Sequence, residues 1–149
     1  MGLDNRPYMN RGRNYSQSVD QSWSITTWLI LINVGIYFVD SQLNGLIKSK
    51  FYFSTEYSLE FWRFISFQFL HANQAHLIFN MVGLYFFGPI VEKYLDKKRY
   101  LAFYLLCGIS GAFLYYVLNL LGFIAGDLRI PGLLSNDLNT PLIGASAGV

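Results

Sequence analysis

The chain has 149 residues, of which 53% are hydrophobic, 18% aromatic and only 13% charged. Soluble domains carry about a quarter charged residues, so this composition is typical of a membrane protein. The formal net charge of +2 is small and the basic residues are scattered, which argues against a nucleic-acid partner. Cys107 is the one cysteine in the sequence and cannot form an internal disulfide.

Uncharged apolar stretches predict the membrane-spanning helices, after a polar tail over residues 1–22. The predicted helices are about 23–39, about 74–91, about 100–123, and a fourth that begins at about 142. A cleaved signal peptide is a weaker interpretation of the first, because its polar lead is long and no small-residue cleavage pattern follows. The expected fold class is all-α: a polytopic membrane helical bundle with three transmembrane helices plus the start of a fourth, forming one incomplete domain over 23–149.

Basic residues predict the orientation of these helices. They gather in the tail and in the turn between the second and third helices, at Arg6, Arg11, Arg13, Lys93, Lys97, Lys98 and Arg99. Because positive residues stay in the cytoplasm, we expect an integral multi-pass protein with a cytoplasmic N-terminus. Segment 40–73 then lies outside, and its interleaved aromatic and charged residues predict an amphipathic segment in the lipid interface. Aromatic residues at headgroup depth are common in membrane proteins of any function, which is the simpler explanation.

The only two histidines and an asparagine lie at the start of the second predicted helix. His76 and Asn80 are four residues apart and therefore share one helical face. His71 is five residues before His76 and is expected in the preceding loop, with a different role. Polar groups inside a membrane are costly, so these residues are candidates for a functional site. Two alternatives are an interhelical hydrogen-bonding pair and a metal site, for which the ligand set is incomplete.

A serine bracketed by glycines follows near the end of the sequence, in Gly144-Ala145-Ser146-Ala147-Gly148. Taken alone, this run is better explained as a small-residue packing surface between membrane helices. Its Gly-x-Ser-x-Gly pattern also matches the nucleophile elbow of α/β-hydrolases, but that motif needs a strand before the serine. The combination with His76 and Asn80 favours catalysis, because a serine that attacks a carbonyl creates an oxyanion and these side chains can donate hydrogen bonds to it.

Together, these residues and their spacing resemble the rhomboid intramembrane serine proteases, over roughly residues 25 to 149. The matching positions are Trp62, Arg63, His71, His76, Asn80, Glu92, Gly144 and Ser146. The resemblance implies that Ser146 is the nucleophile and that His76 and Asn80 stabilise the oxyanion. It assigns structural or accessory roles to Trp62, Arg63, His71, Glu92 and the glycines Gly144 and Gly148. It also implies membrane-protein substrates. We further expect no cofactor and no metal, and a cell membrane of bacterial type.

Two departures from the family pattern shape the expectation. Ala147 follows the serine, where the family most often has glycine, and no histidine follows Ser146 to act as the family's general base. A serine without a base is a poor nucleophile, so we expect a fragment of an intramembrane serine endopeptidase that is inactive by itself. The alternatives are an inactive rhomboid-like protein that binds membrane clients without cleaving them, and a channel or transporter fragment, for which paired broken helices are expected.

Overall fold

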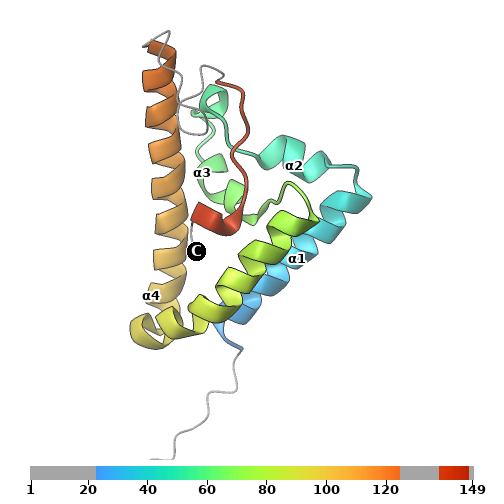
Figure 1. The fold of residues 1–149 in the computed structure, drawn as a ribbon, viewed down its shortest axis with the longest axis vertical. Helices are drawn as coiled ribbons and strands as arrows, with labels where there is room; N and C mark the ends of the chain where they lie inside the picture. Colours follow the sequence, from blue (N-terminus) through green and yellow to red (C-terminus); the bar gives the residue numbers. More distant parts are fainter. Residues whose placement is uncertain (1–22, 125–137, 148–149) are drawn as a thin grey trace, which may run out of the picture.

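A computed structural model describes residues 23–124 and 138–147, and the regular structure of these residues is entirely helical. The polar tail over 1–22, with its three arginines, and Gly148 lie outside the described residues. The helices are α1 (Ile25–Gln42), α2 (Leu46–Phe51), η1 (Thr55–Tyr57), α3 (Arg63–Ser66), η2 (Phe67–Phe69), α4 (Gln74–Ile124) and η3 (Ala145–Ala147). In Figure 1, α4 forms a V whose first arm lies against α1.

The V of α4 has its apex at Asp96, whose backbone (φ 62°, ψ 168°) is not helical. The Asp96 side chain accepts the backbone N–H groups of Lys98 (3.1 Å) and Arg99 (3.2 Å) and so caps the second arm. The second and third predicted helices are thus two arms separated by one non-helical residue, with no turn spanning 92–99. Capping by Asp96 explains why the expected turn is absent, because it lets the second arm begin immediately after the first.

By length and composition, α4 is the one helix in the described part of the chain that could cross a membrane. Helix α1 has 18 residues, and the polar residues Asn33 and Asp40 interrupt its apolar sequence; both are buried in the structure. Leu29 of α1 packs with Leu84, Tyr100 and Tyr104 of α4 in the larger of two buried clusters.

A buried carboxylate joins α1 to the first arm of α4. Glu92 accepts the backbone N–H groups of Ile25 (2.8 Å) and Thr26 (3.1 Å), and also the Thr26 hydroxyl (2.9 Å). These N–H groups belong to the first turn of α1, which carries partial positive charge and lacks intrahelical acceptors. Glu92 therefore fixes the start of α1 beside the apex of the V.

Segment 43–73 connects α1 to α4 through short helical turns. Its Arg63 is buried, donates to Glu60 (2.7 Å) and to the carbonyl of Tyr52 (2.8 Å), and lies over the Tyr52 and Tyr57 rings. Trp62 is exposed. These contacts give Arg63 a role in holding the segment together.

The same segment is anchored to the second arm of α4 by Gln68. Its fully buried amide donates to the carbonyls of Phe64 (3.3 Å) and Leu105 (3.4 Å). Any side chain at Gly108 would overlap Gln68, so this glycine permits the close approach.

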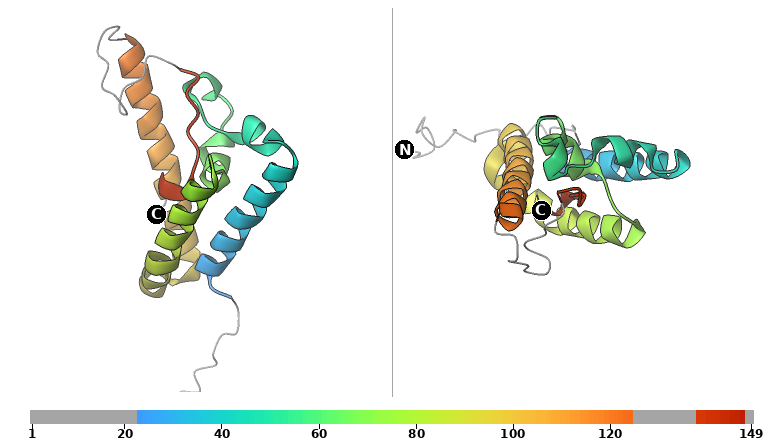
Figure 2. Two further views of the ribbon diagram at one scale, coloured as in Figure 1. Left: turned by 45° about the vertical axis from the view of Figure 1, so that its right-hand side comes forward. Right: turned by 90° about the horizontal axis from the view of Figure 1, so that it is seen from above.

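The last described segment, 138–147, runs between the two arms of α4, as the red trace in Figures 1 and 2 shows. Leu142 pairs with Phe53 through two backbone hydrogen bonds (2.7 and 3.2 Å), and the Tyr115 hydroxyl donates to the carbonyl of Thr140 (2.8 Å). The fourth helix expected from about 142 stays a prediction, because the described residues end at Ala147. The backbone of Leu142 is committed to Phe53, Gly144 adopts φ +124°, and only the short turn η3 follows within the described residues.

Candidate active site

The site is built on the first turns of α4. Asn73 directly precedes the helix, and its side chain accepts the backbone N–H of His76 (2.9 Å), one of the N–H groups that a helix start leaves without a partner. This cap fixes where the helix begins and therefore which way its first side chains point. His76 is half-buried, and Asn80 follows one turn later on the same face, buried at 7% exposure.

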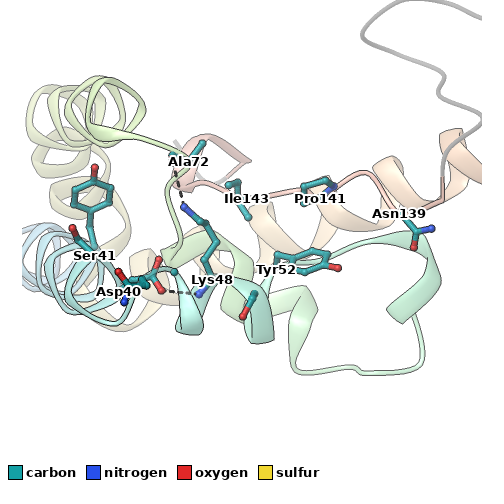
Figure 3. Close-up of a pocket in the computed structure, with 12 residues that line it drawn as sticks. Asp40, Ser41, Lys48, Tyr52, Ala72, Asn139, Pro141 and Ile143 are labelled. Carbon is teal, nitrogen blue, oxygen red and sulfur yellow. Dashed lines mark hydrogen bonds between the residues drawn. The ribbon is translucent and has the colours of Figure 1, made fainter.

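The Ala72 peptide orients the His76 ring. The backbone N–H of Ala72 donates to His76 Nδ1 at 3.5 Å, a long hydrogen bond. A neutral imidazole that accepts at Nδ1 carries its proton on Nε2, so Nε2 is the donor. The carbonyl of Ala72, in the next peptide group, accepts a hydrogen bond from Lys48 Nζ (3.4 Å), while the Lys48 backbone N–H donates to Asp40 (3.0 Å; Figure 3).

Gly144 brings the serine-containing segment against this face. A Cβ atom placed on Gly144 would lie 2.6 Å from both Cε1 and Nε2 of His76, and 3.4 Å from Nδ2 of Asn80. The Gly144 N–H donates to the carbonyl of Phe67 (3.0 Å), which fixes the approach. Two side-chain donors, one from each residue, therefore converge on the backbone two residues before Ser146.

The Asn80 amide is a donor without a partner. Its Nδ2 is buried and makes no hydrogen bond with any described residue. Leaving a buried donor unpaired costs about 1–3 kcal/mol, and such exceptions call for an explanation. An oxygen atom bound between Asn80 and His76 would satisfy Nδ2.

Ser146 lies in the turn η3, which is anchored by the preceding residue, Ala145. Ala145 is fully buried in the cluster that contains Leu29 and Leu84, whereas Ser146 is exposed. The turn packs against α4 and η2. The fold thus holds the backbone at this position and leaves the serine side chain accessible.

His71 lies beside His76 but has a different environment. The ring centroids are 5.4 Å apart, His71 is buried at 2% exposure, and neither of its ring nitrogens has a partner among the described residues. Burial, reinforced by the neighbouring His76, lowers the pKa of His71 to about 4. His71 is therefore neutral at physiological pH.

The remaining residues singled out by sequence do not join this cluster. Glu92 lies at the far end of the first arm, at the start of α1, and Arg63 and Trp62 belong to the connecting segment. No cluster of three or more His, Cys, Asp or Glu residues gathers within 23–124 and 138–147. Sequence reasoning missed Lys48 and Ala72, because a backbone carbonyl and a lysine from a distant turn carry no motif. Asn73 could have been found, since asparagine before an apolar helix is a capping signal.

Comparison with known proteins bears on this arrangement. The rhomboid domain family matches residues 58–149. This range includes His76, Asn80, Gly144 and Ser146 but not Lys48 or Asp40. The chain belongs to the rhomboid family. Rhomboid-family proteins are membrane proteins, and the family includes intramembrane serine proteases.

Relatives of this rhomboid-family chain match it over part of its length. It is 31% identical over 98 residues to rhomboid protease AarA of Providencia stuartii, covering 60% of this chain and 35% of AarA. It is 42% identical over 69 residues to the chloroplastic rhomboid-like protein 11 of Arabidopsis thaliana, covering 44% and 23%. It is 37% identical over 60 residues to rhomboid protease GluP of Bacillus subtilis, covering 40% and 12%. The matched region thus spans about a third or less of each relative.

Proposed function

We propose that this chain forms part of a serine endopeptidase that cleaves peptide bonds in or near the membrane segments of other membrane proteins. The observation that carries the proposal is the convergence of His76 and Asn80 on Gly144, two residues before Ser146. Membership of the rhomboid family supports the same reaction class.

In the proposed reaction, Ser146 Oγ attacks the substrate carbonyl carbon, and the carbonyl electron pair moves onto oxygen. His76 Nε2–H and Asn80 Nδ2–H donate hydrogen bonds to that oxyanion. Collapse of the intermediate expels the amine half of the substrate, which takes up the serine proton from the base, and water then hydrolyses the acyl ester and regenerates Ser146. A donor of this kind typically contributes about 10²–10³ in rate. The buried, unpartnered state of Asn80 Nδ2 supports this role, because the donor is held in place before any charge develops.

The proton of Ser146 needs a base. His76 accepts the Ala72 N–H at Nδ1 and so carries its proton on Nε2, where it serves as a donor to the oxyanion. His71 is buried beside it with a lowered pKa, which makes it a weak base. The proposal therefore assigns the base to a residue outside these 149, and the 149-residue chain alone is expected not to hydrolyse peptides.

The proposed topology has three transmembrane helices and the start of a fourth, with α1 and the two arms of α4 crossing a cell membrane of bacterial type. The N-terminus and the apex at Asp96 would lie on the cytoplasmic side, as the basic residues predict. The contact between Glu92 and the start of α1 supports this, because it brings both to the same end of the bundle.

The test uses the protein from the full natural reading frame, reconstituted in vesicles with a fluorogenic transmembrane substrate. Ser146→Ala should abolish cleavage, and His76→Ala and Asn80→Ala should each slow it about 10²–10³-fold. Ser110→Ala, at an exposed position on the second arm, is the matched control and should keep wild-type activity. Cleavage that survives Ser146→Ala would refute the assignment. A wild-type protein that binds clients without cleaving them would instead establish the non-catalytic alternative.

A further inference from the structure

A cavity of about 700 Å³ lies at the apex of α4, at the opposite end of the first arm from His76. It is lined by Ser24 and Pro89 and by charged residues on both sides of the kink: Glu92, Lys93, Asp96, Lys97 and Lys98. None of these residues has a role in the reaction proposed above.

The electrostatic balance of this cavity favours an anion. Three lysines and two carboxylates line it, so its formal charge is +1. Both carboxylates are already satisfied within the protein, Glu92 by the first turn of α1 and Asp96 by the start of the second arm. The side chains of Lys93 and Lys98 are exposed, and no hydrogen bond or ion pair within the described residues holds either ammonium group.

Aromatic residues indicate the depth of the cavity in the membrane. Trp23 and Trp28 flank Ser24 in and before the first turn of α1, are 58% and 52% exposed, and have ring centroids 5.6 Å apart. Tyr94, next to Lys93, is 84% exposed. Exposed tryptophan and tyrosine side chains are typical of the headgroup level of a bilayer. On the membrane topology proposed above, these side chains place the cavity at the level of the lipid phosphates.

We propose that this cavity binds the phosphate headgroup of an anionic glycerophospholipid, with Lys93 and Lys98 as the principal contacts. Basic pockets between transmembrane helices bind anionic headgroups through the same chemistry. In this arrangement the tryptophan pair flanks the bound lipid where its headgroup meets the acyl chains. The site holds the apex of α4 against the bilayer surface independently of any catalytic activity.

Tryptophan quenching tests the proposal on the protein from the full natural reading frame. Trp62 and any tryptophan outside these 149 residues are replaced by Phe, so that Trp23 and Trp28 are the only reporters, and the protein is placed in phosphatidylcholine vesicles that contain a small fraction of brominated lipid. Brominated phosphatidylglycerol should quench more strongly than brominated phosphatidylcholine. The double variant Lys93→Gln/Lys98→Gln should lower the relative affinity for phosphatidylglycerol roughly 30-fold. Lys50→Gln, which removes an exposed lysine on α2 far from the cavity, should leave the preference unchanged.

Three results would overturn the proposal: equal quenching by the two brominated lipids, the same preference in the double variant, or displacement by inorganic phosphate at constant ionic strength, which would make the site one for free phosphate. Equal quenching of wild type and variant by phosphatidylcholine checks that the variant is inserted and folded. Should the variant fail that check, the wild type still decides, because a preference for phosphatidylglycerol that is insensitive to added salt would contradict a lysine–phosphate site.

Discussion

Replacing Gly144 with alanine perturbs the site at the point where its two halves meet. The backbone of Gly144 has φ +124°, a conformation that other residues rarely adopt. An added Cβ would lie 2.6 Å from His76 Nε2, whereas ordinary contacts begin at 3.4 Å. The His76 ring or the Gly144 backbone must therefore retreat by about 0.8 Å.

The expected loss of stability follows from the strained backbone at residue 144 and from the close contact of the new Cβ with His76. Holding a side chain in a disfavoured backbone region costs about 1–3 kcal/mol, and overpacking a closely fitted site costs about the same again. Gly144→Ala should thus lower the free energy of unfolding by roughly 2–6 kcal/mol. A displacement approaching 1 Å can cost about 10²-fold in rate, so proteolysis should fall by that factor even in the folded fraction.

The assay compares thermal unfolding in detergent and substrate cleavage in vesicles for Gly144→Ala and Gly35→Ala. Gly35 lies in the middle of α1 with open space around its Cα, so alanine there should be neutral or stabilising by about 0.5–1 kcal/mol. The reasoning is refuted if Gly144→Ala melts and cleaves like Gly35→Ala. A destabilised variant with an unchanged rate per folded molecule would support the role of Gly144 in packing and exclude its role in positioning the catalytic groups.

Three further predictions concern groups around the site and at the apex of α4. Glu92→Gln should lower the unfolding free energy by about 2–4 kcal/mol in a detergent melt, because it replaces a charge-assisted acceptor of the α1 N–H groups with a neutral amide. Lys48→Met removes the contact to the Ala72 carbonyl and should reduce kcat about 3–10-fold with little change in KM, as expected from a lost hydrogen bond of about 1 kcal/mol. The pKa of His71 is 6.5 in the unfolded chain and about 4 in the folded protein, so the free energy of unfolding should be highest above pH 6.5 and fall by about 2–3 kcal/mol as the pH drops to 4. His71→Gln should flatten that pH dependence, and a wild-type melting temperature that does not change with pH would contradict it.

The sequence predicts the helical faces well where periodicity alone decides them. His76 and Asn80 share a face because α4 is regular there, and the structure adds that Gly144 meets the same face. The kink at Asp96 was less predictable. The sequence shows a charged stretch and hence a turn, but only the capping of Lys98 and Arg99 by Asp96 shows that the second arm restarts at once.

The path of the serine segment could not be predicted, since it depends on pairing between distant residues. A small-residue apolar run is equally compatible with a helix or an extended chain. The Phe53–Leu142 pairing and the Gly144 conformation select the extended chain. Taken alone, the Gly-x-x-x-Gly pattern favours a packing surface between helices, whereas in the structure Gly144 lets the backbone approach His76.

The contact of Gly144 with His76 changes the role expected of this glycine in the reaction. If glycine were needed only for helix packing, alanine at 144 would be tolerated as another small residue. Because the glycine sits at positive φ against His76 Nε2, the same substitution is expected to separate the donor from the serine segment. Stability and rate should therefore fall together at Gly144. At Gly108, whose absent side chain makes room for Gln68 between segment 43–73 and the second arm of α4, alanine should lower stability while the rate per folded molecule stays close to wild type.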